Sequence, residues 1–536
     1  MMPTAKVTSS LIRSATSTPP PVVDTIKPRM VHRPLIAPVI ALAVLTLTWP
    51  GPILPFSASP ALAAQPVTGT LPNATGATTG WVSPNLDGQV YAEPLFYGGI
   101  VYAATLNNTI YALNGRTGRV VWSHHLRTPK SSGWSCGNVS PQGILGTPVI
   151  DPAGGRIYAA TLGSDSIYRL EGLRLTDGLE QLNTVITTPA GGFDWTIEQE
   201  RGALAVANGY VYVPMGGRAG DCGSYHGYVF AVPIDGSTVT HYYQTPGQGM
   251  GIWAAGGVVV DSSTGKVFVS TGNGTGSGCN ANGNGTATYE NDAIVRLSST
   301  LAHEDAFYPE DWQNLWCAND QDLGSASPLL ISPTLMFASG KWGTGFLLNP
   351  ASLGGMGGQQ FPAAHTDTAD VCFGNNSDAT FGSFAYAPPY IYVECEGQGL
   401  VALNLNTSTP SFSLCDATCG PPTWNTGDTN TYGPPIVAGG IVWVATNGGG
   451  LYGFNAATGA PMFQSSSFGI NRFVTPSEAC GHVFVPAGSV VRSFNMTFTV
   501  PPQDCFRVAA VQGPAASPTG RPPVVPVSPA PTPPSR

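Results

Sequence analysis

The chain has 536 residues, of which 42% are hydrophobic and 10% are charged, and its formal net charge is −9. This length allows a large buried core, whereas the negative charge excludes the basic stripe that a nucleic-acid surface needs. The 67 glycines and 49 prolines predict many turns.

The first 64 residues are typical of an export signal. Three basic residues, an apolar stretch and a run of small residues follow in order: Lys27, Arg29 and Arg33, then residues 35–49, then residues 61–64. This order predicts a secretory signal peptide with a long leader, cleaved near Ala63 or Ala64, and hence a secreted or extracytoplasmic protein. An uncleaved signal anchor is the alternative, and the start is either Met1 or Met30. No later segment is long and apolar enough to span a bilayer.

After a linker at residues 65–80, one pattern recurs eight times. A small or apolar run, a short turn and a β-branched run centred on an aromatic residue follow one another at intervals of roughly 50 residues, as in a β-propeller. The central aromatics are Tyr102, Tyr158, Tyr212, Phe268, Phe337, Tyr392, Trp443 and Phe484. We therefore expect an all-β propeller of about eight four-stranded antiparallel blades over residues 81–512.

The first unit shows the strands most clearly. Runs at 91–96, 100–105, 109–113 and 119–122 are separated by the turn dipeptides 98–99, 107–108 and 117–118. Because an open ring exposes unpaired strand edges, we expect strands from both termini to close it, with residues 80–82 as the amino-terminal closing strand. Seven blades remain the alternative count.

All ten cysteines follow the export signal, and an even number in an exported chain predicts disulfides. We expect bridges between Cys415 and Cys419 and between Cys480 and Cys505. A metal site is the alternative, although the chain has no CxxC pair. The proline-rich residues 513–536 predict a disordered, extended tail.

Two segments resemble the repeat of the pyrroloquinoline quinone (PQQ) propeller family. These are IYALNGRTGRVVW at residues 110–122 and LYGFNAATGAPMF at residues 451–463. The family contains exported quinoprotein alcohol dehydrogenases and also noncatalytic assembly factors. The resemblance therefore implies a fold and leaves the activity open.

The resemblance to the dehydrogenases implies five site residues. Asp322 occupies a place similar to that of the catalytic base and Lys341 to that of a cofactor-binding cation, and Asn273 matches a metal ligand. Trp253, as a cofactor-binding residue, and Asp221, as a metal ligand, are only approximately placed. In that chemistry a carboxylate takes the alcohol proton while calcium and a cation polarise the quinone.

Structural roles are the alternatives for three of these residues. Asn273 can support a tight turn, Asp322 can accept hydrogen bonds from backbone amides, and Lys341 can pair with a carboxylate at a blade edge. Trp253 also lies two positions earlier than the family pattern, and the adjacent cysteine pair of the alcohol dehydrogenases is absent.

These departures favour a binding or scaffolding module over an enzyme. Its partner, a protein or a small molecule, would bind at the propeller loops or central funnel. We expect a monomer with no nucleic-acid partner. The alternative is a calcium- and PQQ-dependent dehydrogenase of alcohols or sugars, so PQQ and calcium are the cofactors to test.

Overall fold

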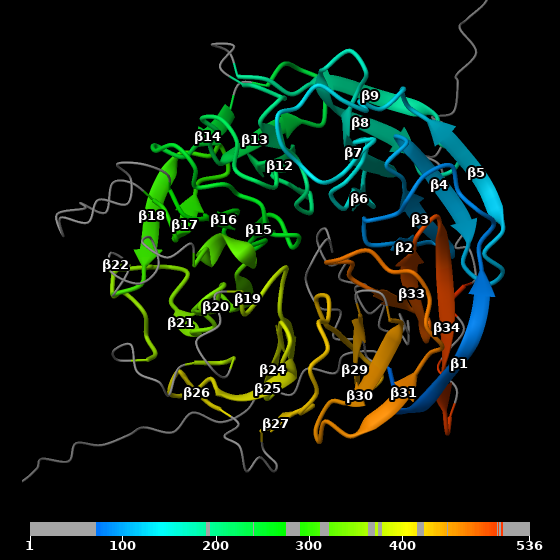
Figure 1. The fold of residues 1–536 in the computed structure, drawn as a ribbon, viewed down its shortest axis with the longest axis vertical. Coiled ribbons are helices and arrows are strands. Elements are labelled where there is room, and N and C mark those ends of the chain that lie inside the picture. The colour runs from blue at the N-terminus through cyan, green and yellow to red at the C-terminus, as the bar shows by residue number, and fades with distance from the viewer. Residues whose placement is uncertain are drawn as a thin grey trace, which may run out of the picture. The chain divides into compact units, whose positions relative to one another are not determined.

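The computed structural model confirms the predicted all-β propeller. It describes residues 71–188, 193–239, 241–274, 290–310, 321–362, 370–372, 378–414, 423–446, 449–500, 502 and 505–506. The strands form eight small sheets arranged in a ring, which supports eight blades over seven (Figure 1). Among these residues, none of the helices could cross a membrane. The signal peptide, the proline-rich tail at residues 513–536 and the expected Cys415–Cys419 pair lie outside them.

Three blades are four-stranded antiparallel sheets whose strands follow chain order from the axis outwards (Figure 1). Two-residue turns at 98–99 and 439–440 join the two innermost strands of the first and seventh blades, and the other connections within these three blades are longer. In the first, second and seventh blades the strands are β2 (Leu95–Tyr97), β3 (Ile100–Ala104), β4 (Thr109–Asn114), β5 (Val120–His125); β6 (Val149–Asp151), β7 (Arg156–Leu162), β8 (Tyr168–Arg174), β9 (Glu180–Val185); and β28 (Ile436–Ala438), β29 (Ile441–Ala445), β30 (Leu451–Asn455), β31 (Pro461–Gln464).

The third to sixth blades depart from the four-stranded plan. The third, fourth and sixth each have five strands, and the fifth has three among the described residues. A short parallel pair joins the end of the fourth blade to a strand that follows the fifth. The strands are β10 (Glu198–Gln199), β11 (Ala205–Ala207), β12 (Tyr210–Gly217), β13 (Tyr228–Pro233), β14 (His241–Gln244); β15 (Val259–Val260), β16 (Val267–Ser270), β17 (Ile294–Leu297), β18 (His303–Tyr308), β22 (Gly355–Met356); β19 (Leu329–Ser332), β20 (Leu335–Ala338), β21 (Phe346–Leu348); and β23 (Ala385–Ala387), β24 (Tyr390–Cys395), β25 (Gly399–Asn406), β26 (Ser411–Ser413), β27 (Trp424–Asn425).

Strands from both ends of the propeller share the eighth blade, as expected. It consists of β32 (Ser477–Ala479), β33 (His482–Ala487), β34 (Val490–Phe498) and, outermost, β1 (Ala74–Val82). β1 runs antiparallel to β34 and pairs Ala74 with Phe498 and Val82 with Arg492. The closing strand is longer than residues 80–82 and begins inside the expected linker, because its alternate residues pack on the neighbouring blade.

The eight central aromatics are the core residues of the blades. Each is 3% exposed or less, and each lies in the second strand from the axis. The apolar clusters that contain them join strands of neighbouring blades, for example Tyr158 of the second blade with Val213 of the third. Burying both faces of each sheet explains why the inner strands read as continuous apolar runs.

Tryptophans on outer strands fasten one blade to the next. Trp81 of β1 donates its Nε1–H to the carbonyl oxygen of Gly115 in the first blade (2.8 Å). Trp122 and Trp424 make the same bond to the second and seventh blades. Each indole covers a turn glycine with positive φ, and a Cβ at Gly118 would lie 2.3 Å from a ring carbon of Trp81. Only glycine therefore fits beneath the indole.

Three disulfides brace the described residues. The predicted bridge between Cys480 and Cys505 is confirmed. Two further bridges, Cys136–Cys222 and Cys372–Cys395, were not predicted as pairs. Disulfides persist in oxidising compartments, so they are compatible with the expected extracytoplasmic location.

Candidate functional site

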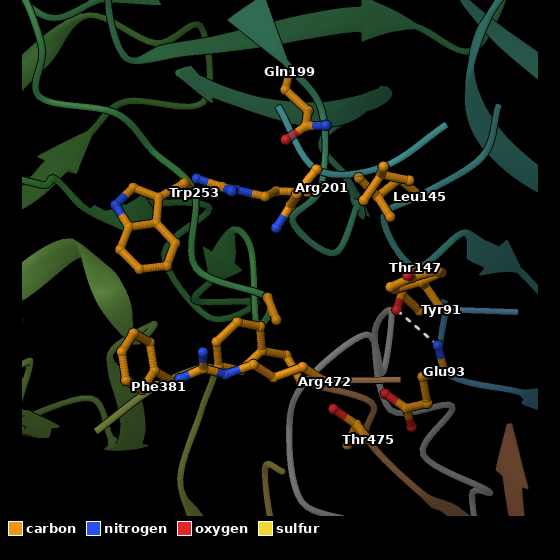
Figure 2. A pocket seen from close by; sticks show the side chains of 14 residues that line it. Tyr91, Glu93, Leu145, Thr147, Gln199, Arg201, Trp253, Phe381, Arg472 and Thr475 are labelled. Carbon is orange, nitrogen blue, oxygen red and sulfur yellow. Dashed lines mark hydrogen bonds between the residues drawn. The ribbon is translucent and has the colours of Figure 1, made fainter. Parts of the chain in front are cut away.

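Six of the eight blades contribute residues to the wall of a cavity of about 240 Å³ (Figure 2). The cavity therefore lies at the axis of the ring. This volume is near the lower end of small-molecule pockets, which is about 300 Å³. Most of the lining residues lie within six residues before the innermost strand of one of these six blades. They are Tyr91, Glu93, Asn138, Val139, Leu145, Thr147, Gln199, Arg201, Trp253, Ala255, Phe381, Arg472, Phe473 and Thr475.

One side of the cavity is aromatic. The rings of Trp253 and Phe381 lie 6.1 Å apart between centroids, with 50° between their planes. Phe473 extends this wall, with its centroid 5.0 Å from that of Phe381. Flat apolar faces of this kind stack against planar ligands and exclude water.

Two arginines lie against the aromatic wall, and only one of them has a carboxylate partner among the described residues. The guanidinium of Arg201 lies 4.8 Å from the centroid of Trp253, and that of Arg472 lies 4.7 Å from that of Phe473. Arg472 forms a two-pronged ion pair with Glu396. Within the described part of the chain, Arg201 donates only to the carbonyl oxygen of Gly217, at 3.3 Å.

The opposite side carries an acid. Figure 2 shows Glu93 beside Tyr91 and Thr147, away from Trp253. The backbone N–H of Glu93 donates to the hydroxyl oxygen of Thr147 (3.0 Å). Burial raises the pKa of the Glu93 carboxyl well above its usual range and so favours the neutral form, which can donate a hydrogen bond.

The residues predicted from the dehydrogenase resemblance meet beside this cavity. Lys341 Nζ lies 2.6 Å from Asp322 Oδ2, and 5.8 Å from the ring centroid of Trp253. The backbone N–H of Asn273 donates to Asp322 Oδ1 (2.7 Å). Asp322 and Lys341 are both largely buried, with side chains 7% and 12% exposed.

Glycines make this cluster possible. Asp322 precedes the short turn η2 (Leu323–Ser325), and the strand β16 ends directly before Thr271 and Gly272. A Cβ at Gly272 would lie 2.3 Å from Asp322 Oδ1, and one at Gly340 would lie 2.5 Å from the Asp322 carbonyl oxygen. Side chains at these positions would displace the carboxylate.

Asp221 approaches the same region from the third blade. The disulfide Cys136–Cys222 holds its loop against the segment before the second blade. Burial lowers the pKa of Arg201, and the charges of Asp221 and Asp322 partly oppose this shift. Thus contacts join Asn273, Asp322, Lys341 and Trp253, whereas Asp221 is linked to them only through its charge, which, like that of Asp322, acts on Arg201.

The described residues do not gather the ligands that calcium needs. Both carboxylate oxygens of Asp322 already have partners, and no group of three or more His, Cys, Asp or Glu side chains among the described residues could hold a metal ion. Nor does any described disulfide join adjacent cysteines. The aromatic face and the neighbouring cations can contact a planar anion.

A second cavity of about 570 Å³ opens beside β10. Its lining includes Asp194, Glu198 and His226, and the backbone N–H of His226 donates to Glu198 (3.0 Å). Burial raises the pKa of Glu198 to about 8. Sequence reasoning missed this acid, because its neighbours come from three separate loops.

Comparisons with known proteins support the repeat family and the fold. Residues 71–268 match the family model described as "Outer membrane protein assembly factor BamB". This match confirms the resemblance to PQQ-repeat propellers over those residues. No curated protein sequence matches the chain.

Solved structures similar to this chain include two quinohemoprotein alcohol dehydrogenases and a BamB protein. A quinohemoprotein alcohol dehydrogenase from Pseudomonas putida HK5 is 15% identical, with a TM-score of 0.56 over 82% of this chain and 79% of that one. Its counterpart from Comamonas testosteroni is 16% identical, with a TM-score of 0.56 over 80% and 78%. BamB from Moraxella catarrhalis is 12% identical, with a TM-score of 0.50 over 78% and 100%. At these identities the likeness establishes the propeller fold alone.

Proposed function

We propose that this PQQ-repeat propeller is an exported binding module that holds a small ligand in its axial cavity. The observation that carries the proposal is the cavity itself, which combines an aromatic wall, a guanidinium and a carboxyl group. Pockets of mixed character, mostly apolar with a few convergent polar groups, are typical ligand sites.

Equivalent positions of the blades carry unlike residues, which supports a binding role. The fourth residue before the innermost strand is small in the fourth and fifth blades, where it is Ala255 and Ser325. At the same position the first, third and sixth blades carry Tyr91, Arg201 and Phe381, which all line the cavity. Since small residues suffice for packing there, the large ones favour recognition of a ligand.

Filling the cavity tests the proposal. Ala255→Trp places an indole in the cavity wall, whereas Ala457→Trp, in an exposed outer turn, is the matched control. A fragment library is screened by thermal shift and then by calorimetry. We expect fragments that bind the native protein and the Ala457→Trp variant but lose affinity about tenfold or more for Ala255→Trp. Binding that survives in Ala255→Trp would place the site elsewhere and contradict the proposal.

The ion pair of Asp322 and Lys341 beside Trp253 supports a second candidate, the calcium- and PQQ-dependent dehydrogenase. The test is incubation with calcium and PQQ, followed by a PQQ titration and dye-linked oxidation of an alcohol and sugar panel. Turnover that disappears in Asp322→Ala but persists in Asp177→Ala, a change at an exposed turn, would favour this candidate. No binding at micromolar PQQ would exclude it.

Export is part of the proposal and has its own test. Intact-mass measurement of the secreted protein should show an amino terminus near Ala63 or Ala64 and a mass reduced by the hydrogens lost in disulfide formation. Ten free thiols in the mature protein would contradict the assigned compartment.

A further inference from the structure

We infer that the axial cavity binds a small aromatic carboxylate, with Arg201 as the residue that anchors the carboxylate. This inference rests on the proposed function, because it assigns a ligand class to the same cavity. It is derived from the charge, shape and polar ends of the cavity.

The charge of the cavity favours an anion. Two guanidiniums line it, and Glu396 neutralises that of Arg472. Arg201 has no carboxylate within 4.0 Å among the described residues, and its buried Nε has no hydrogen-bond partner. A partly buried cation without a counter-ion is costly, and a ligand carboxylate removes this cost by bonding to the planar guanidinium.

The position of Arg201 also points to an aromatic ligand. Its guanidinium lies over Trp253, so an anion bound to it lies next to the edge of the aromatic wall. Figure 2 shows Trp253 and Phe381 on the same side of the cavity, with Arg201 and Arg472 reaching towards them. A flat ring attached to the carboxylate would therefore contact Trp253 and Phe381.

Glu93 defines the other end of the ligand. Its carboxyl has no hydrogen bond with the described residues, and it lies across the cavity from Trp253 (Figure 2). A neutral Glu93 donates a hydrogen bond to an acceptor, such as a phenol oxygen, and does not repel an anion. Thr147 and Tyr91 add hydroxyl groups at this end.

Other ligand classes fit less well. A cationic ligand would face the guanidiniums of Arg201 and Arg472. A neutral apolar ligand would bury Arg201 further without a counter-ion. The cavity, at about 240 Å³, suits a single-ring compound.

The experiment compares 4-hydroxybenzoate with its neutral isostere 4-hydroxybenzamide by calorimetry. We expect the carboxylate to bind the native protein at least about tenfold more tightly than the amide. In Arg201→Gln this preference should disappear, whereas Arg174→Gln, which removes an exposed arginine of an outer turn, should keep it. Equal affinities for the two compounds, or an unchanged preference in Arg201→Gln, would overturn the inference.

A second variant tests the acid end. Because glutamine has the shape of a protonated glutamate, Glu93→Gln should change the affinity for 4-hydroxybenzoate by less than about threefold. A gain of about tenfold or more would show that Glu93 is ionised and repels the ligand, which contradicts the assigned arrangement.

The outcomes separate this inference from the proposed function. If the amide binds as tightly as the carboxylate and Ala255→Trp abolishes both, the cavity is a binding site and the ligand class is wrong. If neither compound binds and no fragment depends on Ala255, the proposed function fails with it. Binding of PQQ alone, without either benzoate derivative, would favour the dehydrogenase.

Discussion

Replacing Trp81 tests how the ring is closed. This residue lies on β1, the outermost strand of the eighth blade, and donates a hydrogen bond to the carbonyl oxygen of Gly115 in the first blade. Its indole also covers Gly118 and lies 5.7 Å from the ring of Phe484. Trp81 therefore joins the two blades that meet at the chain termini.

The hydrogen bond and the ring packing of Trp81 contribute separately to the free energy of unfolding. Trp81→Phe keeps most of the ring contact and removes the N–H donor, so the free energy of unfolding should fall by about 1 kcal/mol. Trp81→Ala removes both and leaves a void above Gly118. Because the indole is only partly buried, the expected loss is about 3 kcal/mol, at the low end for tryptophan truncation.

Guanidinium denaturation followed by circular dichroism measures these losses. Trp122→Phe is the internal comparison, since Trp122 makes the same bond (3.1 Å) within the ring and not at its closure. It should lose the same amount as Trp81→Phe. A Trp81→Ala variant as stable as the native protein would refute the reasoning that this indole fastens the closing strand.

Three further predictions concern stability. Cys505→Ala should lower the free energy of unfolding by about 3 kcal/mol in nonreducing denaturation, because the bridge to Cys480 closes a loop with a sequence separation of 25. Burial raises the pKa of Glu478 to about 7. The contribution of this group to the free energy of unfolding is therefore full below about pH 4.5, the pKa of the unfolded chain, and is lost as the pH rises through 7. Glu478→Gln should flatten this part of a pH-stability profile, and an unchanged profile would contradict the prediction. Lys341→Met should cost about 3 kcal/mol by leaving Asp322 unpaired, and adding Asp322→Asn should recover part of that loss in a double-mutant cycle.

Local patterns explain how much of the fold could be predicted. The aromatics of the second strands, such as Tyr158 and Trp443, mark apolar runs bounded by turn dipeptides, and both features lie within a few residues of one another. The bridge between Cys480 and Cys505 joins a turn of the eighth blade to the segment directly after its strand β34, so the two cysteines are close in the sequence. Cys136 and Cys222 are 86 residues apart and meet only because the second and third blades are adjacent.

The cavity wall could not be predicted for a related reason. Asp322 and Lys341 were found because a motif marks each of them, and the fold places them 2.6 Å apart. Arg201, Phe381 and Arg472 carry no motif, and they converge only after the ring has closed. The signal that could have found them is their position four or five residues before an innermost strand, where the fourth blade has an alanine.

The same geometry predicts a conflict between stability and binding at Arg201. Its guanidinium is partly buried, has no carboxylate within 4.0 Å among the described residues, and has a pKa lowered by burial. Replacing such a cation with an apolar side chain of similar length is often stabilising, so Arg201→Met should raise the free energy of unfolding of the ligand-free protein by about 1 kcal/mol. The variant should also lose its preference for 4-hydroxybenzoate over the amide. Destabilisation by Arg201→Met would show instead that this arginine has a packing role, since a residue kept for binding is expected to cost stability when the ligand is absent.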